Sequence, residues 1–462
     1  MGLMKHCDSR QLSIGLLTPY TGGNLGDGAI QEAVIANLRA RFPGCRLQAF
    51  TLDPVNTERL HQIPCAPLTA LSVPHYRVNT APAPADAPKP MADEPMAVQR
   101  LKEAVKKIAP LYRLAQFARQ VAKVAACLSA EARFLRDGYR TLKGLDLLIV
   151  SGGGQLDDYW GGPWGHPFSL LKWGVLARLA NTPYLFLSVG TCAIESRLSF
   201  HFVKWALRLA DYRSYRDARS KQRLEKMAFT GGDPVCPDLA FSLEIPRRSV
   251  SSVGAGGRPV VGVSPIAYLS SHSWPKSDLG TYEPYIATLK SFVASLLAEG
   301  TTVILYFTDS TDKVVVRELA GELQSFAADS PGTLAVQPTE TVAELLQLMG
   351  RVDYVVASRL HGVILAHLMD RPVVAISYDT KVDTHMNELG QQEYCLDIHR
   401  LELAALCRAY AALRGESQAA RTRISAQAAK YRSLLAAQYD GLLNYSGARV
   451  LTPARAMSRR CQ

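Results

Sequence analysis

The sequence lacks several features that would assign it to common classes of protein. Its nine cysteines include no Cys-x-x-Cys pair, so neither a zinc cluster nor a disulfide framework is predicted. No apolar run reaches the roughly 18 residues that span a bilayer, and the run 12–17 is too short for the core of a signal peptide. These absences predict a globular, cytoplasmic protein in a reducing compartment.

Several catalytic and binding signatures are also missing. The chain has no Gly-Lys-Ser phosphate-binding loop, no Gly-x-Ser-x-Gly elbow and no Asp-x-Asp spacing. Five histidines without metal-ligand spacing are expected to be structural: His166, His201, His272, His367 and His385. We therefore expect no cofactor, no obligatory metal and no serine hydrolase.

The net charge of +11 is unevenly distributed, because residues 100–143 contain eleven basic and three acidic side chains. Residues 98–142 are predicted to form one or two amphipathic helices, interrupted around Pro110. This basic segment either packs on the domain with a solvated face or rests on an anionic membrane surface, which would make the protein peripheral to the inner membrane face. Nucleic acid is not expected, since no aromatic stacking platform accompanies the charge.

Alternating strand and helix patterns predict an α/β fold with two parallel sheets. The first domain is expected at residues 1–247, with the basic insertion at about 78–143, and the second at 258–400. A hinge is expected near 245–257. Residues 401–462 are predicted to form helices and a basic tail, with a long helix near 416–443 crossing back to the first domain.

The most informative segment is 353–381, which reads as a buried strand at 354–357, a short apolar helix and a second strand near 372–376. Ser358, Arg359 and His361 lie at the turn and in the first helical residues. Free backbone N–H groups, the helix dipole and a guanidinium favour a phosphate or carboxylate at this place. His361 adds a side chain suited to proton transfer near neutral pH.

Two glycine-rich turns follow other buried strands. In PYTGGNLGDGAI at 19–30, Asn24, Gly26 and Asp27 stand at a helix start, where Asp27 either caps the helix or contacts a substrate. In SGGGQLDDY at 151–159, three consecutive glycines, Gly152 to Gly154, indicate close approach to a ligand or a neighbouring domain. Both turns are predicted to line one cleft.

Two shorter motifs are open to more than one interpretation. Ser-Val-Gly-Thr at 188–191 ends another strand, and it either lines the same cleft or forms a simple turn. Arg216 and Asp217 are either a surface ion pair or part of an anion site.

Five motifs occur in an order that resembles the polysaccharide pyruvyl transferase family: Asn-Leu-Gly-Asp at 24–27, Ser-Gly-Gly-Gly at 151–154, Ser-Tyr-Arg-Asp at 214–217, Pro-Asp at 237–238 and Ser-Arg-Leu-His-Gly at 358–362. The similarity spans about residues 12–390. It implies a GT-B-like fold, in which two Rossmann-like domains face each other across a cleft. It also implies a role in polysaccharide biosynthesis, for an exopolysaccharide or another cell-envelope glycan.

The resemblance further implies a pyruvyltransferase that moves the enolpyruvyl group of phosphoenolpyruvate onto two hydroxyls of a glycan as a ketal. His361 would be the general acid and Asp27 the candidate for hydroxyl activation. Donor binding would fall to Arg359, Arg216, Ser358 and Lys381, and the cleft would be lined by Asn24, Gly26, Gly152, Gly153 and Gly154. The acceptor would be a glycan or a lipid-linked saccharide.

Two other functions remain open from the residues. A GT-B nucleotide-sugar glycosyltransferase would use the same two-domain cleft and the same kind of anion site. A catalytically idle cleft protein would instead anchor an assembly complex through the basic insertion. The Ser-Arg-Leu-His sequence argues against both.

Overall fold

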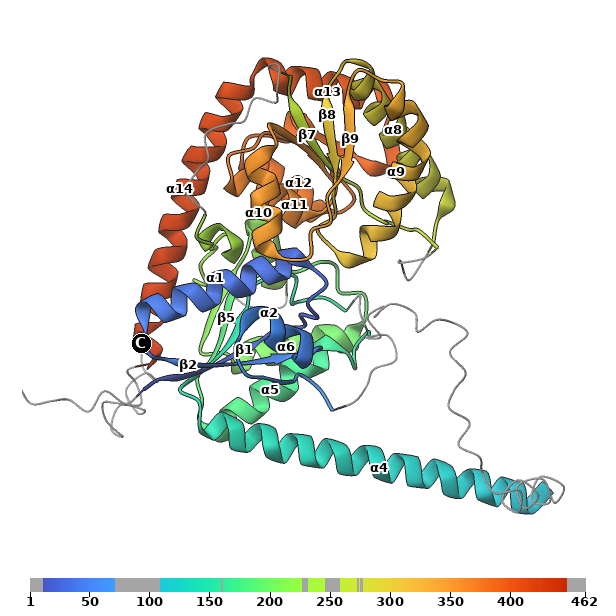
Figure 1. The fold of residues 1–462 in the computed structure, drawn as a ribbon. Coiled ribbons are helices and arrows are strands. Elements are labelled where there is room, and N and C mark those ends of the chain that lie inside the picture. Colours follow the sequence, from blue (N-terminus) through green and yellow to red (C-terminus); the bar gives the residue numbers. More distant parts are fainter. Residues whose placement is uncertain are drawn as a thin grey trace, which may run out of the picture.

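The computed structural model describes residues 11–70, 109–158, 161–226, 232–245, 258–271, 274 and 277–446. It contains two six-stranded sheets, one in each half of the chain, and both are covered by helices (Figure 1). All strand pairings within the two sheets are parallel. The predicted α/β class with two Rossmann-like units is confirmed.

The first sheet has the strand order β3-β2-β1-β4-β5-β6. Its central strands are short runs of apolar residues that are buried on both faces, as expected for a covered parallel sheet. The strands are β1 (Ser13–Leu17), β2 (Arg46–Thr51), β3 (Cys65–Pro67), β4 (Leu147–Ser151), β5 (Tyr184–Val189) and β6 (Tyr212–Tyr215). The helices are α1 (Leu25–Arg41), α2 (Pro54–His61), α4 (Ala109–Lys143), α5 (His166–Ala180), α6 (Arg197–Leu209) and α7 (Ala218–Glu225), followed by the 3₁₀ helix η2 (Leu239–Ser242).

The second sheet repeats this design in the order β12-β11-β10-β7-β8-β9. Its strands are β7 (Val260–Ser264), β8 (Thr302–Leu305), β9 (Thr333–Val336), β10 (Tyr354–Ala357), β11 (Val373–Ser377) and β12 (Cys395–Asp397). Its helices are α8 (Leu279–Ala298), α9 (Lys313–Ala328), α10 (Val342–Arg351), α11 (Leu360–Leu368) and α12 (Thr380–Glu388), with 3₁₀ turns η3 (Ser310–Asp312), η4 (Gln392–Tyr394) and η5 (Ile398–Arg400). The edge strands β3, β6, β9 and β12 are absent from the sequence prediction, because they are only three or four residues long and, apart from β6, have no buried residue.

The basic insertion contributes α4, a 35-residue helix that extends away from the body of the first domain (Figure 1). Pro110 lies in its first turn, where a missing N–H costs little, so Pro110 does not interrupt the described helix. Residues 78–108 lie outside the described part of the chain. Among the described helices, none is long and apolar enough to cross a membrane.

Three helices follow the second sheet: α13 (Leu403–Gly415), α14 (Ser417–Gly441) and α15 (Leu443–Ser446). The long helix α14 contacts both domains (Figure 1). Near its start, Arg421 donates a 2.9 Å hydrogen bond to the carbonyl of Asp353, and near its end Gln438 donates a 2.7 Å bond to Ser214 Oγ. The expected hinge at 245–257 lies, apart from Ile245, outside the described residues.

The two domains also meet at the carboxyl ends of their strands. The turn after β1 pairs with the loop after β8: Leu25 N–H donates to the Thr308 carbonyl, and Ser310 N–H donates to the Gly23 carbonyl, both at 2.9 Å. These bonds place the start of α1 beside the start of α11, where the predicted site residues lie.

Candidate active site

The cleft between the domains places His361 of the second domain against Asp238 of the first. The imidazole Nε2 lies 3.5 Å from Asp238 Oδ2, and the two side chains are 13% and 4% exposed. Asp238 is fixed at the start of η2, where its Oδ1 accepts a hydrogen bond from the N–H of Ala240. Burial alone would raise the pKa of Asp238, but His361 and Arg216 outweigh it and hold this pKa at about 2.

Arg216 lies on the other side of the same carboxylate. Its Nη1 is 3.7 Å from Asp238 Oδ2, and its Nε donates to Asp217 Oδ2 at 3.3 Å. Gly190 makes room for it, since a Cβ at that position would lie 2.6 Å from the guanidinium carbon. Arg216 is therefore a buried cation of the cleft, and Gly190 of the Ser-Val-Gly-Thr motif lies beside it.

The start of α1 is capped by Asn24, whose side chain accepts from the N–H groups of Gly26 and Asp27. The alternative in which Asp27 caps the helix is therefore wrong. Gly26 packs directly against the catalytic candidate, because a Cβ there would lie 2.0 Å from His361 Cγ. Burial raises the pKa of Asp27 above its usual range, although His361 opposes the shift.

The triple glycine forms the turn after β4, beside Asp27. Gly152 and Gly153 have φ angles of 57° and 74°, which glycine adopts without strain. Gly152 packs closely on Leu239, and a Cβ on Gly153 would lie 3.5 Å from Asp27 Oδ1. Gly154 is exposed. This turn packs beneath η2 and leaves the backbone close to the Asp27 carboxylate.

Arg359 is placed differently from the expectation of a free anion clamp. Its Nε and Nη2 donate to the two carboxylate oxygens of Asp312 at 2.7 and 2.9 Å, and Nη2 also donates to Thr311 Oγ1. Asp312 is fully buried, so this bidentate pair fixes the loop after β8 to the start of α11. In this conformation most donors of Arg359 are used within the second domain.

Ser358 contacts the core of the second domain. Its side chain is fully buried, and its hydroxyl lies 2.9 Å from the hydroxyl of Tyr285. Either hydroxyl can be the donor of this hydrogen bond within the core of the second domain. The Ser358 hydroxyl therefore supports the turn from beneath, and the assignment of Ser358 to donor binding stays a prediction.

Lys381 follows β11 and lies on the cleft side of the second domain. Its Nζ is 3.7 Å from Asp379 Oδ2 and 5.1 Å from the ring centre of Tyr378. Cys192 of the first domain donates to the same Asp379 carboxylate at 3.9 Å, a long contact for sulfur. Lys381 is therefore close to where the two domains meet.

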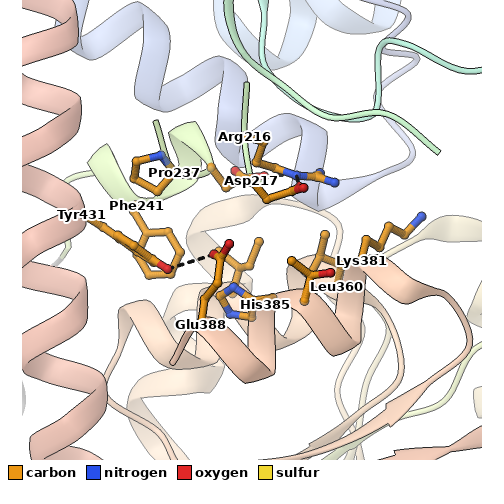
Figure 2. A pocket seen from close by; sticks show the side chains of 12 residues that line it. Arg216, Asp217, Pro237, Phe241, Leu360, Lys381, His385, Glu388 and Tyr431 are labelled. Atoms are coloured by element: carbon orange, nitrogen blue, oxygen red, sulfur yellow. Dashed lines mark hydrogen bonds and ion pairs between the residues drawn. The ribbon is translucent and has the colours of Figure 1, made fainter. Parts of the chain in front are cut away.

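Figure 2 shows a small pocket next to these residues, between the two domains and α14. Arg216 and Asp217 lie on one side, and Lys381, His385 and Glu388 lie on the other. Asp238 lines this pocket, and the imidazole of His361 lies 3.5 Å from its carboxylate.

The sequence profile of the polysaccharide pyruvyl transferase family matches residues 24–380. The chain belongs to this family. It is therefore a transferase. The match includes Asp27, Arg216, Asp238 and His361, whereas Lys381 and His385 lie just beyond its end. No curated protein matches the sequence.

Solved structures similar to this pyruvyl transferase show the GT-B fold. MnaA of S. aureus with UDP superposes with a TM-score of 0.54 at 9% identity, covering 95% of this chain and 97% of that chain. A glycosyltransferase of Rickettsia africae gives 0.52 at 9% identity, with 94% and 98% covered. UDP-GlcNAc 2-epimerase of Methanocaldococcus jannaschii gives 0.50 at 10% identity, with 87% and 92% covered.

Asp238 is the site residue of this pyruvyl transferase that sequence reasoning missed. Pro-Asp at 237–238 is one of the five family motifs, but the sequence assigns Asp238 no role, since a lone aspartate carries no sign of its partner. His385 was also expected to be structural, yet it lines the pocket. Its Nε2 lies 3.1 Å from Nδ1 of the buried His367. Burial lowers the pKa of His385 to about 3, so it is neutral at physiological pH.

The absence of an obligatory metal stays a prediction. In the described ranges, no group of three or more histidine, cysteine or acidic side chains is arranged to hold a metal ion.

Proposed function

We propose that this pyruvyl transferase moves the enolpyruvyl group of phosphoenolpyruvate onto two hydroxyls of one glycan, which yields a cyclic pyruvate ketal and phosphate. The observation that carries the proposal is the His361–Asp238–Arg216 arrangement across the domain cleft. It combines a proton donor with a fixed carboxylate and a buried cation, as the transfer requires.

The donor has close to three negative charges, and two cations of the cleft support its binding there. Arg216 and Lys381 come from opposite domains, so both could contact a ligand held between them. The backbone N–H groups at the start of α11 add to these, because this helix has no side-chain cap. Arg359 acts mainly through Asp312, by fixing this helix start.

The chemistry follows from these positions. His361 gives its proton to the methylene carbon of the donor, and C2 becomes an oxocarbenium-like centre. A glycan hydroxyl attacks C2 and loses its proton to Asp27, whose raised pKa makes its carboxylate a stronger base. The C–O bond to phosphate then breaks, and phosphate leaves. The second hydroxyl attacks the regenerated cation and closes the ketal ring, and its proton returns to His361.

Asp238 is a positioning residue in this scheme. Its carboxylate stays ionised and lies between Nε2 of His361 and Nη1 of Arg216, so it fixes the imidazole relative to the anion site. The scheme needs no metal and no further cofactor.

The acceptor is proposed to be a glycan or a lipid-linked saccharide, reached from a cytoplasmic enzyme. Residues 98–142 are proposed as a peripheral membrane contact, because α4 contains seven basic and two acidic residues. Charge reversal of Arg113, Arg119 and Lys123 tests this link while leaving the part of α4 that packs on α5. Unchanged sedimentation with anionic vesicles would remove the membrane role of this segment.

The function is tested by incubating the purified protein with phosphoenolpyruvate and candidate glycans and measuring phosphate release and product mass. We expect phosphate release that depends on the glycan. Transfer from a nucleotide sugar, with no reaction of phosphoenolpyruvate, would instead support the glycosyltransferase alternative.

A further inference from the structure

The outward side of α5 is apolar, although it faces solvent. The helix buries Leu170, Trp173 and Ala177 in the first domain, as expected for a helix that covers a sheet. On its opposite side Val175 and Leu179 are 42% and 66% exposed. Two adjacent, strongly exposed aliphatic side chains on the same helix face indicate a surface that is covered in use.

The neighbouring helix α6 has the same property. Its exposed side presents Leu198 and Trp205, which are 39% and 52% exposed. Trp164, 61% exposed, joins the two helices: its ring centre lies 5.2 Å from that of Phe168 on α5 and 5.5 Å from that of Phe202 on α6. We call Trp164, Val175, Leu179, Leu198 and Trp205 the α5–α6 face.

The charge beside this face is basic on α6. The helix has three cations and no acidic residue, whereas on α5 Lys172 is buried against Glu131 and Arg178 pairs with Asp211. On α6 each of the three cations precedes an apolar residue, so a basic stripe of Arg197, Lys204 and Arg208 runs beside the apolar one. Arg208 lies over the Trp205 ring at 5.2 Å, which places cation and aromatic group side by side.

We propose that the α5–α6 face docks on the surface of an anionic lipid bilayer. Apolar and aromatic side chains would enter the headgroup region, and the adjacent cations would pair with lipid phosphates. A second copy of the chain fits less well, because a two-fold contact would bring two basic stripes together without acidic partners.

The position of the face gives the docking a consequence for the reaction, which rests on the proposed function. Trp164 and Leu198 lie at the amino-terminal ends of α5 and α6. These helices follow β4 and β5, so their amino-terminal ends lie at the carboxyl ends of the strands, where the cleft is. A bilayer on this face would therefore lie beside the cleft and would present the saccharide of a lipid-linked acceptor to it.

The test is co-sedimentation of the full-length protein with phosphatidylcholine vesicles, with and without phosphatidylglycerol. The face variant carries Leu179→Glu and Trp205→Glu, and the matched control carries Phe326→Glu and Val336→Glu, which change two side chains of 43% exposure in the second domain. We expect salt-sensitive binding of the wild type to anionic vesicles only. Binding of the face variant should be at least about tenfold weaker, because two large apolar side chains no longer enter the lipid, and the control should bind like the wild type.

Equal binding of the face variant and the wild type would overturn the proposal, as would a wild type that binds neither vesicle. A wild-type dimer that the face variant converts to a monomer in sedimentation velocity, without vesicle binding, would assign the face to a second copy instead. Phosphate release with a lipid-free glycan should be the same in wild type and face variant. This readout separates failure of membrane docking from failure of the proposed transfer.

Discussion

Two helix starts meet in the cleft, one from each domain, and they are built differently. At α1 the Asn24 side chain caps the helix and accepts from two N–H groups. At α11 Arg359 stands at the cap position without capping, and its guanidinium turns away to Asp312. The first helix start thus satisfies its own amides, whereas the second leaves them available.

The difference indicates that the two domains contribute different groups to the cleft. The start of α1 offers a glycine, which lets the domains approach, and the Asp27 carboxylate. The start of α11 offers open amides and the His361 imidazole, so it suits an anionic donor. Asp238 and Arg216 of the first domain then complete the environment of a residue from the second. Each of the following variants tests one part of this contrast.

Loss of His361 should have the largest effect. His361→Ala should lower kcat for ketal formation by about 10²–10⁴-fold, the usual contribution of a general acid, with little change in the thermal midpoint. The matched control is His399→Ala, at an exposed histidine of the same domain. A His361→Ala variant with wild-type kcat would show that the second helix start supplies no proton.

Loss of Arg359 should lower the stability of the fold as well as weaken donor binding. Arg359→Ala leaves the buried Asp312 carboxylate unpaired and should lower the free energy of unfolding by about 3–5 kcal/mol. Chemical denaturation measures this change, and Lys290→Ala, which breaks an exposed pair with Glu322, should change it by less than about 1 kcal/mol. If Arg359→Ala raises KM for phosphoenolpyruvate without loss of stability, Arg359 binds the donor directly.

Removal of the Asp238 charge should misplace the imidazole. Asp238→Asn should lower kcat by about a hundredfold, the effect of a shift of about 1 Å at a reacting group. Asp233→Asn is the control, since Asp233 pairs with Arg213 on the same segment outside the cleft. Equal activity of the two variants would exclude a positioning role.

The same variant should change the acid sensitivity of the fold. With the pKa of Asp238 held at about 2, below its ordinary 3.8, the carboxylate stabilises the folded state above pH 4. This contribution is lost as the pH falls from about 4 through 2, and Asp238→Asn should remove that part of the unfolding profile.

The last comparison concerns the contact between the helix starts. Gly26→Ala would place a Cβ 2.0 Å from His361 Cγ, so the ring or the domains must shift, and activity should fall by up to about a hundredfold. Gly321→Ala in α9 meets no atom within 4 Å and should stabilise the fold by about 0.5–1 kcal/mol without loss of activity. Wild-type activity of Gly26→Ala would show that this approach of the domains is not needed.

The sequence predicts the buried central strands well, because β4 and β10 are continuous apolar runs bounded by glycine or polar turns. The position of His361 follows from the same pattern, because it lies in the first turn of the helix that follows β10. The partner of Arg359 does not follow, since Asp312 lies on a loop 47 residues earlier. Asp238 likewise gains its role only from two partners that the fold brings together, one from each domain.

The central claim is that His361 protonates the donor's methylene carbon and that a glycan hydroxyl then attacks C2. It is tested most directly by running the reaction in D₂O and measuring isotope content of the ketal methyl group. The account predicts one deuterium in each methyl for the wild type and no product for His361→Ala. A ketal methyl without deuterium, or undiminished labelled product from His361→Ala, would contradict it.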